Sequence, residues 1–320
     1  PIFSEDRNIV VTFNGEIYNF AELRSDLQKK GHSFRTNTDT EVIVHSYEQY
    51  GLDFPKHLNG MFAIALFDRK KTRLVFARDH IGIKPLYYYM DKTSMVWGSE
   101  IKALLASGLV SRELDINSLA EFLCWEYVPG ERTLFKNIHR LPPATILCID
   151  TRNFSIVQNQ YWDVQVQADN TVDEEGWIAA LDSIITKCVR DQLVSDVPLG
   201  AFLSGGVDSS LVTAAMTNPE TFSIGFDNPD YNELPWSQKV ADHLGTRHLT
   251  KIMKPDLLAE FANLTEHLDD PIGDFSIFPS FLVSKLARQH VTVSMSGDGG
   301  DELFGGYETH LAQHIADIIT

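Results

Sequence analysis

The sequence predicts two domains of different fold class, an α+β domain followed by an α/β domain with a parallel sheet. Over residues 1–165, short strand signals come in pairs separated by turns, which is typical of antiparallel hairpins. Over residues 175–320, strands and helices alternate, which is typical of a doubly wound parallel sheet. The segment 165–176 is polar and rich in turn residues, so we place the domain boundary there.

Apolar spacing defines the elements expected in the first half. The run NIVVTF predicts a strand at 8–13, and the NGE that follows is typical of a turn. Apolar residues at helical spacing predict helices at 20–31 and 38–51. Further strands, several of them joined by charged or polar turns, are expected at 61–68, 73–79, 86–90, 95–100, 144–149 and 154–158.

The second half begins with an amphipathic helix expected at 177–193. The strands expected after it are 198–203, 221–226, 248–252 and 291–295, and the helices are 207–216, 236–245, 255–268, 276–290 and 310–320. Ligands of open α/β sheets bind beyond the carboxyl ends of the strands. The glycine-rich loops that follow the strands 198–203 and 291–295 are therefore the first places to look for a site.

Composition and charge exclude several classes of protein. Hydrophobic residues are 43% and charged residues 22% of the chain, which is ordinary globular usage. Residues 166–320 hold 8 Lys and Arg against 24 Asp and Glu, a balance of −16 within a total of −17, which argues against a nucleic-acid partner. The longest apolar run, 61–67, is far shorter than the roughly 20 residues that span a bilayer, and no signal peptide is visible. We expect small-molecule partners, no nucleic acid, no membrane and a cytoplasmic location.

The cysteines and histidines form no recognisable ligand spacing. Cys124, Cys148 and Cys188 are widely spaced, and we expect three buried thiols in a reducing compartment. Histidines such as His32 and His45 are expected to be packed or exposed rather than to bind metal.

The strongest motif is LSGGVDSS, residues 203–210, between an expected strand and an expected helix. Backbone N–H groups and the dipole at a helix start favour a phosphate, and Gly205 and Gly206 let the backbone approach it. Asp208 suits a Mg²⁺ ion that bridges phosphates. The hydroxyl groups placed to donate to phosphate oxygens are those of Ser204, Ser209 and Ser210. The alternative is a plain Ser/Gly turn with a helix cap.

A second glycine-rich loop, 295–307, follows the last expected strand with the sequence MSGDGGDELFGGY. Asp208 and Asp301 make a plausible Mg²⁺ pair, and Asp298 would act on the substrate side. The alternative is a flexible acidic turn or a calcium-like loop, although the spacing lacks the EF-hand form.

Together these two loops resemble the synthetase domain of glutamine-hydrolysing asparagine synthetases, members of the PP-loop ATP pyrophosphatase superfamily. In the first half, NGEIYNF, TDTE, LNGMFAIALFD, ARDHIGIKPLYY and SEIKALL resemble the glutaminase domain of the same family. The resemblance covers nearly the whole chain. It implies a class II amidotransferase domain of the N-terminal-nucleophile (αββα) fold over 1–165 and an ATP-binding synthetase domain over 175–320.

The resemblance implies a reaction at two sites. Glutamine is hydrolysed in the first domain and the ammonia passes through an internal tunnel. In the second domain ATP adenylates aspartate, pyrophosphate leaves, and ammonia attacks the acyl-adenylate to give asparagine. The implied cofactors are ATP and Mg²⁺, the implied partners are glutamine, aspartate and ATP, and a homodimer is compatible with the family.

In the first domain the resemblance implies an oxyanion hole at Asn14 and Gly15. Glu16 would help to hold glutamine, and Asp39 would pair with its α-ammonium group. From the residues alone, a hairpin turn at Asn14-Gly15 and a helix cap at Asp39 are favoured instead. The expected structural features nearby are a buried Arg78–Asp79 ion pair, a turn at Lys84-Pro85 and a capping role for Glu100.

In the second domain the resemblance implies that Leu203 and Ile224 line the adenine site. The residues implied to contact the rest of ATP are Ser204, Gly205, Gly206, Ser209, Ser210, Ser296 and Gly297. Asp208 and Asp301 would bind Mg²⁺, and Asp298 would lie beside the adenylate.

The sequence also departs from the family. It begins at Pro1, no cysteine precedes Asn14, and it ends inside an expected helix, so we expect a protein truncated at both ends that as written lacks glutaminase activity. Two alternative functions stay open. One is amidation of another carboxylate, such as a sugar acid of a surface polysaccharide. The other is a catalytically inactive fragment that binds nucleotide.

Overall fold

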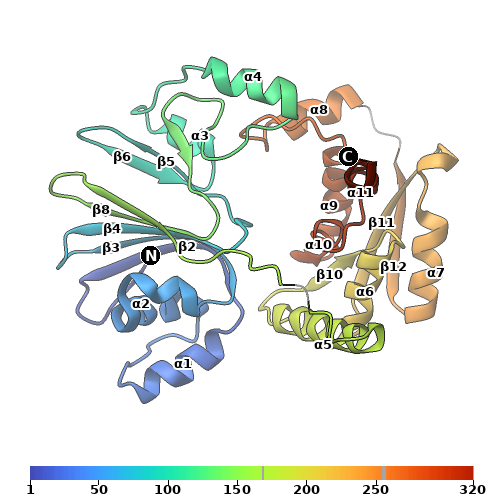
Figure 1. The fold of residues 1–320 in the computed structure, drawn as a ribbon, viewed down its shortest axis with the longest axis horizontal. Coiled ribbons are helices and arrows are strands. Elements are labelled where there is room, and N and C mark those ends of the chain that lie inside the picture. The colour runs from blue at the N-terminus through green and yellow to red at the C-terminus, as the bar shows by residue number, and fades with distance from the viewer. Residues whose placement is uncertain (168, 254–256, 320) are drawn as a thin grey trace. The chain divides into compact units, whose positions relative to one another are not determined.

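Antiparallel hairpins build the first half of the chain, as the sequence predicts (Figure 1). The computed structural model describes residues 1–167, 169–253 and 257–319. Six strands pair in the order β1-β2-β3-β4-β8-β9, and every pair is antiparallel. These strands are β1 (Ile2–Phe3), β2 (Ile9–Ile17), β3 (Gly60–Asp68), β4 (Arg73–Arg78), β8 (Thr145–Asp150) and β9 (Ile156–Gln160).

A second, three-stranded antiparallel sheet has the order β6-β5-β7. Its strands are β5 (Tyr87–Met90), β6 (Met95–Gly98) and β7 (Ile138–Arg140). The helices that accompany the two sheets are α1 (Phe20–Lys29), α2 (Asp39–Tyr50), η1 (Gly51–His57), α3 (Ile101–Ala106) and α4 (Ile116–Trp125). The sequence reasoning missed β1, β7, η1 and α3, because short elements have too few residues to show a period. It also missed α4, which is as long as the predicted α1.

Three apolar clusters show how these elements are layered. The first joins α1 and α2 to one face of the large sheet, through Leu27, Val44 and Phe62 among others. The second joins the opposite face of that sheet to the small sheet, with Phe76 fully buried between them. The third joins the small sheet to α3 through Leu104. The order of layers is therefore helix, sheet, sheet, helix.

The second half carries a four-stranded sheet in the order β12-β11-β10-β13, and all of its pairs are parallel, as predicted. Its strands are β10 (Leu199–Phe202), β11 (Glu220–Phe226), β12 (Arg247–Met253) and β13 (Val293–Met295). The chain moves outward from β10 to β12 and then returns to place β13 on the other side of β10. The strand order therefore reverses between β10 and β13, at the topological switch point where open α/β sheets bind ligands.

The helices of this half follow the predicted alternation. They are α5 (Glu174–Gln192), α6 (Val207–Ala215), η2 (Pro229–Tyr231), α7 (Leu234–Leu244), α8 (Leu257–Thr265), α9 (Ile277–Ala287), α10 (Gly300–Phe304) and α11 (Glu308–Ile319). Pro255 and Asp256, at the predicted start of one helix, and Thr320, at the predicted end of another, lie outside the described residues. No helix in the described part of the chain is both long and apolar enough to cross a lipid bilayer.

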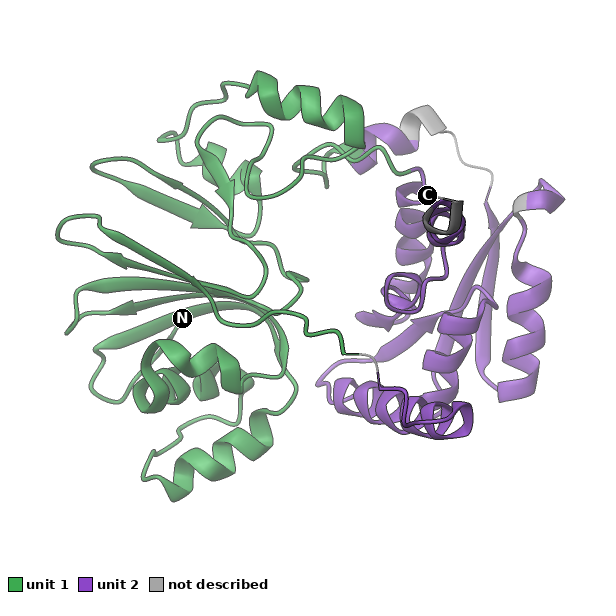
Figure 2. Ribbon diagram, viewed as in Figure 1, with its two compact units in different colours: residues 1–168, 265–274 green, residues 169–264, 275–320 purple. Residues whose placement is uncertain are grey.

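The chain divides into two compact units, and one short segment crosses the division (Figure 2). Unit 1 is Pro1–Ala168 with Thr265–Asp274, and unit 2 is Asp169–Leu264 with Phe275–Thr320. Ten residues from the later half of the sequence therefore pack with the first unit.

Two aspartates hold this segment in unit 1. The carboxylate of Asp269 accepts hydrogen bonds from the first backbone N–H groups of α3, at Ile101 (2.7 Å) and Lys102 (3.3 Å). Asp270 pairs with Arg140 at 2.8 Å, and burial raises the pKa of its carboxyl group. The predicted capping role of Glu100 is wrong, since its side chain makes no capping hydrogen bond to α3.

Candidate functional sites

The end of β2 holds the first group of predicted site residues. Gly15 lies opposite Phe62 within β2 and β3, at φ +150°, and a Cβ added to it would lie 2.0 Å from the Met61 carbonyl oxygen. The facing Gly60 is equally constrained, because its Cβ would lie 2.1 Å from the Glu16 carbonyl oxygen. The hairpin turn predicted at Asn14-Gly15 is therefore wrong. The strand runs on to Ile17, and the two glycines allow an unusually close approach of the backbones.

Asn14 and Asp39 both bond to groups around this strand end. Asn14 is exposed, and its Nδ2 donates to Ser99 Oγ at 3.0 Å. Asp39 Oδ2 accepts from the backbone N–H of Ile17 at 3.0 Å, although Asp39 is the first residue of α2. The predicted helix cap at Asp39 is wrong, since Thr38 holds the N-cap position and Asp39 turns toward the strand.

Negative charge gathers at this strand end. Burial, with a further contribution from the Glu16 and Asp79 carboxylates, raises the pKa of Tyr18 to about 12. The exposed Glu16 and the half-buried Asp39 flank the same stretch of β2. Such a field favours a cationic group of a ligand, such as an α-ammonium group.

Asp79 anchors the loop that follows β4. Its fully buried carboxylate accepts from the backbone N–H groups of Phe62 (3.1 Å), Ile83 (2.8 Å) and Lys84 (2.9 Å). Arg78 donates to backbone carbonyls, among them that of Leu141 at 2.6 Å. The expected Arg78–Asp79 ion pair is wrong, because Arg78 donates to backbone carbonyls and Asp79 accepts from backbone N–H groups, and the two side chains do not pair with each other.

The motif 203–210 lies where β10 passes into α6, as predicted. The Ser204 and Ser209 hydroxyls are 2.9 Å apart, and Gly206 N–H donates to Ser204 Oγ at 3.1 Å. Ser210 donates to the Gly206 carbonyl at 2.6 Å. No side chain caps α6, so the N–H groups of its first turn remain available to an anion.

Gly205 explains why the loop is tight. It adopts φ +88°, and an added Cβ would lie 2.6 Å from the backbone nitrogen of Ser237 and 2.8 Å from the Trp236 side chain. The start of α7 is thereby packed against the loop, and Trp236 remains 61% exposed beside it. The sequence reasoning missed Trp236, because it lies 26 residues beyond Ser210, the end of the motif, with no pattern of its own.

The second glycine-rich loop lies directly against the first. A Cβ on Gly297 would lie 2.7 Å from the Ser209 nitrogen, and one on Gly300 would lie 2.5 Å from Asp208 Cγ. The two loops follow β10 and β13, so they meet at the switch point of the sheet. Within this loop the Ser296 hydroxyl donates to Asp298 Oδ2 at 2.9 Å. The structure therefore brings Asp208 together with the loop that carries Ser296 to Asp301.

Asp208 and Asp301 fit the chemistry of a hard divalent cation. Both are half-buried carboxylates, the donor type that Mg²⁺ prefers, and in the part of the chain that the structure describes neither pairs with a lysine or arginine. Among the described residues they belong to no group of three metal-ligating side chains. Phosphate oxygens and water would have to complete a magnesium shell here, as is usual for this ion.

Of the predicted adenine residues, Leu203 directly follows β10 and Ile224 lies on the neighbouring β11. Leu203 is buried, and its backbone N–H donates to the Phe222 carbonyl at 3.0 Å. Ile224 is half-buried on β11 and packs with the Phe222 cluster.

The prediction of three buried thiols is wrong, because Cys124 and Cys188 are exposed and Cys148 is only half-buried. The expectation that no histidines share a ligand arrangement is also wrong. His32 and His45 converge with Glu48, although the two histidines are thirteen positions apart.

Comparison with known proteins identifies relatives of both halves. The glutamine amidotransferase domain family matches residues 1–162, and the asparagine synthase family matches residues 180–318. A putative glutamine-hydrolysing asparagine synthetase 2 of Methanocaldococcus jannaschii is 37% identical over 98% of this chain and 61% of that protein. Glutamine-hydrolysing asparagine synthetase 1 of Bacillus subtilis is 34% identical over 97% of this chain and 49% of that protein.

A more distant relative carries another name. The protein called amidase chyE from Penicillium rubens is 29% identical over 99% of this chain and 50% of that protein. The chain thus spans between about half and three fifths of the length of these relatives.

Proposed function

The chain belongs to the family of glutamine-hydrolysing asparagine synthetases, and we propose from this that it serves ATP-dependent asparagine synthesis with glutamine as the nitrogen donor. Residues 1–165 would form the glutaminase domain, of the N-terminal-nucleophile fold, and residues 175–320 the ATP-binding part of the synthetase domain. The relatives named as asparagine synthetases support this reading.

In the first domain the residues at the end of β2 would bind glutamine and stabilise its tetrahedral intermediate. Asn14 Nδ2 has two hydrogens, and only one is needed for Ser99, so the other can donate to an oxyanion together with the Gly15 N–H. Glu16 and Asp39 would hold the amino-acid end of glutamine, and Asp39 would pair with the α-ammonium group. Its bond from the Ile17 N–H fixes the Asp39 carboxylate for that pairing.

In the second domain the two glycine loops would hold ATP. Leu203 and Ile224 would contact adenine. The phosphates would lie on the loop N–H groups and the hydroxyls of Ser204, Ser209 and Ser210, with Ser296 and Gly297 on the facing loop. Asp208 and Asp301 would hold Mg²⁺, which would offset the charge of the leaving pyrophosphate.

Asp298 would lie beside the acyl-adenylate. The Ser296 hydroxyl orients its carboxylate, which leaves Asp298 Oδ1 free to act as an acceptor on the substrate side. The side-chain carboxylate of aspartate would attack the α-phosphorus of ATP and pyrophosphate would leave. AMP would then be a good leaving group on the acyl carbon, so that ammonia could displace it and form the amide.

The observation that carries the proposal is the contact of the two glycine loops at the switch point of a parallel sheet. The bare backbones of Gly297 and Gly300 let the second loop close onto Asp208 and Ser209. An acidic loop pressed onto an uncapped helix start is hard to explain by stability alone, because the nearby carboxylates would repel each other unless a cation lies between them.

The test is pyrophosphate release from Mg²⁺-ATP with ammonium as nitrogen source, measured with aspartate and with other carboxylic acids. We expect aspartate to stimulate release. The Asp208→Ala variant should lose that release. Asp242→Ala, which removes a carboxylate elsewhere in the domain, should keep it. Stimulation by another acid but not by aspartate would contradict asparagine synthesis.

A second candidate acceptor stays open, and one relative of this chain carries a name other than asparagine synthetase. The residues assigned above would bind glutamine and ATP, and none of them selects the acceptor, so a sugar acid of a surface polysaccharide is the alternative substrate. ATP binding without turnover on any acid would instead indicate an inactive nucleotide-binding protein. A cytoplasmic location, which unpaired thiols favour, and a homodimer complete the proposal.

A further inference from the structure

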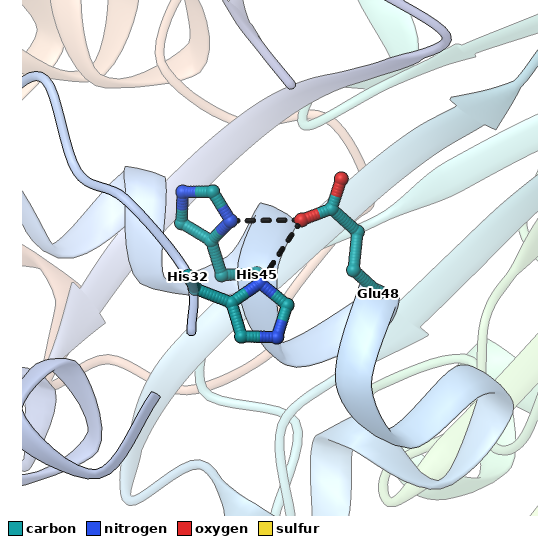
Figure 3. A group of neighbouring side chains, drawn as sticks. All are labelled: His32, His45 and Glu48. Carbon is teal, nitrogen blue, oxygen red and sulfur yellow. Dashed lines mark hydrogen bonds and ion pairs between the residues drawn. The ribbon is translucent and has the colours of Figure 1, made fainter. Parts of the chain in front are cut away.

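Two histidines and a glutamate converge outside both proposed sites, in unit 1 (Figure 3). His32 lies in the loop after α1, and His45 and Glu48 lie one turn apart on α2. Glu48 Oε2 is 2.8 Å from His45 Nδ1 and 3.4 Å from His32 Nδ1. One nitrogen of each ring and one carboxylate oxygen all lie within 4.8 Å of one another.

These separations suit a tetrahedral zinc ion. Zinc–ligand distances of about 2.0–2.2 Å place neighbouring ligand atoms of a tetrahedron about 3.3 Å apart. The donor set of two imidazoles and one carboxylate is one that zinc uses in proteins. The His45 side chain is 2% exposed, whereas those of His32 and Glu48 are 18% and 24% exposed. Solvent can therefore reach the cluster and supply a fourth ligand.

The outer nitrogen of each ring also has an oxygen partner. His45 Nε2 faces Glu41 Oε1 at 3.7 Å, and His32 Nε2 is 3.2 Å from Gln49 Oε1. Metal-binding histidines usually donate their second N–H to such a partner, which fixes the ring and its tautomer.

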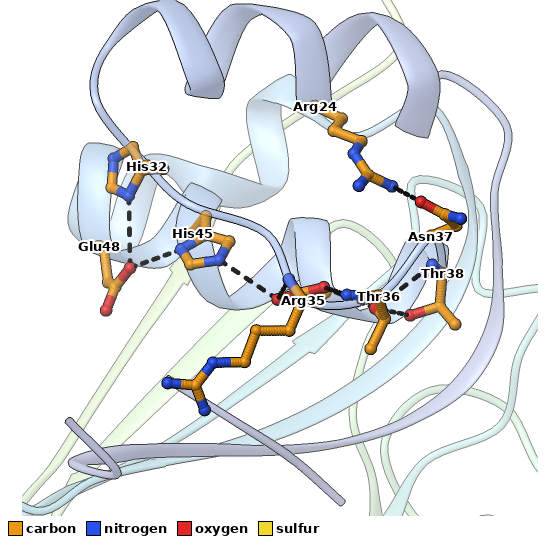
Figure 4. A network of polar contacts seen from close by, with 9 residues as sticks. Arg24, His32, Arg35, Thr36, Asn37, Thr38, His45 and Glu48 are labelled. Carbon is orange, nitrogen blue, oxygen red and sulfur yellow. Dashed lines mark hydrogen bonds and ion pairs between the residues drawn. The ribbon is translucent and has the colours of Figure 1, made fainter. Parts of the chain in front are cut away.

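Glu41 is itself held in place by the loop before α2, whose residues Arg35 and Thr36 are labelled in Figure 4. Its carboxylate accepts from the backbone N–H groups of Arg35 (2.8 Å) and Thr36 (2.6 Å). It is buried, so its orientation toward His45 is set by the loop rather than by solvent.

The number of ring hydrogens on His32 and His45 favours a cation between the two rings and Glu48. All four nitrogens of the two rings face oxygen atoms, but two neutral imidazoles carry only two hydrogens between them. If both hydrogens lie on the outer nitrogens, the inner nitrogens point lone pairs at the Glu48 carboxylate. A metal ion bound to both inner nitrogens and to Glu48 Oε2 would satisfy every atom of the cluster.

We infer that His32, His45 and Glu48 bind a divalent transition metal of the zinc type, with Glu41 and Gln49 as the outer partners of the two rings. The ion would tie the 31–38 loop to α2. Because α2 begins at Asp39, the ion would stabilise the helix that carries this proposed glutamine residue without touching glutamine itself. The inference stands on this cluster alone and does not depend on the proposed function.

The experiment is zinc binding to protein that has been stripped with a chelator, measured as bound zinc per chain and as affinity in competition with a chromophoric chelator. The variants are His32→Gln and Glu48→Gln, which change the more exposed ligands and so preserve the fold. The matched control is His57→Gln, which changes an exposed histidine of the same unit.

We expect the wild type and His57→Gln to bind one more zinc ion per chain than either ligand variant. Glu41→Gln should keep the stoichiometry and weaken the affinity about tenfold to a hundredfold, as for other outer partners of metal-bound histidines. Zinc should raise the melting temperature of the wild type and not of Glu48→Gln.

Equal zinc stoichiometry in the wild type, His32→Gln and Glu48→Gln would overturn the inference. So would an absence of zinc binding by the wild type. In either case the cluster would be a hydrogen-bonded network in which Glu48 accepts from protonated histidines.

Discussion

Replacing Gly15 with alanine tests the close approach of β2 and β3. The new Cβ would lie 2.0 Å from the Met61 carbonyl oxygen, where ordinary contact begins at 3.4 Å, so the strands must part by more than an ångström. Parting at this point breaks about two backbone hydrogen bonds, each contributing about 1 kcal/mol net. The unfavourable backbone conformation at φ +150° adds about 1–3 kcal/mol.

The sum is about 3–5 kcal/mol, which corresponds to a fall of roughly 6–20 °C in the melting temperature of a unit of this size. The control is Gly31→Ala, which also has a positive φ (+97°) but has no atom within 4 Å of the added Cβ. It should lose about 1 kcal/mol, a few degrees. Scanning calorimetry of the whole chain would follow the transition of unit 1.

A melting temperature for Gly15→Ala that stays within two or so degrees of Gly31→Ala would refute the reasoning. It would mean that the strands yield at little cost, and that Gly15 is not required there by sterics.

Three further predictions concern unit 1. Asp79→Asn should cost about 2–4 kcal/mol in thermal unfolding, because a single amide oxygen cannot accept from all three backbone N–H groups that now donate to the buried carboxylate. Asp91→Asn, in an exposed turn of similar hydrogen bonding, should change the melting temperature little. Asp269→Ala should cost about 1 kcal/mol by uncapping α3, and an equal loss in Glu100→Ala would contradict that role. Burial lowers the pKa of His80, so the unfolded chain binds the extra proton more readily and stability falls as the pH drops below 6.5. The melting temperature should therefore fall less between pH 7.5 and 5.5 in His80→Gln than in the wild type, and identical pH dependence would rule the contribution out.

The sequence was most informative where a pattern repeats or a motif is local. The alternation of strands and helices predicted the parallel sheet, and the position of 203–210 between a strand and a helix is confirmed. Both are set by neighbouring residues, whose period or turn chemistry can be recognised along the chain.

The sequence was misleading where distant partners decide the conformation. Asn-Gly favours a turn by itself, but pairing with β3 draws Asn14-Gly15 into a strand. The position of Asp39 favours a helix cap, but its carboxylate instead accepts from the backbone N–H of Ile17. The position of Glu100 also favours a cap, but the carboxylate of Asp269 accepts from the first N–H group of α3 instead. Each of these outcomes depends on a residue that is far away in the sequence, so no local pattern could have shown it.

Because Thr265–Asp274 packs into unit 1, a single cut in the chain between the two units does not divide it into unit 1 and unit 2. A protease that cut the polar stretch around 165–176 would leave two pieces held together by the contacts of Asp269 with α3 and of Asp270 with Arg140. An engineer who exchanged the first domain between relatives would have to transplant these ten residues as well, or leave α3 uncapped and Arg140 without its carboxylate. The same constraint applies in evolution. The two units can diverge in sequence only while this segment still packs against unit 1 and still connects at both ends to unit 2.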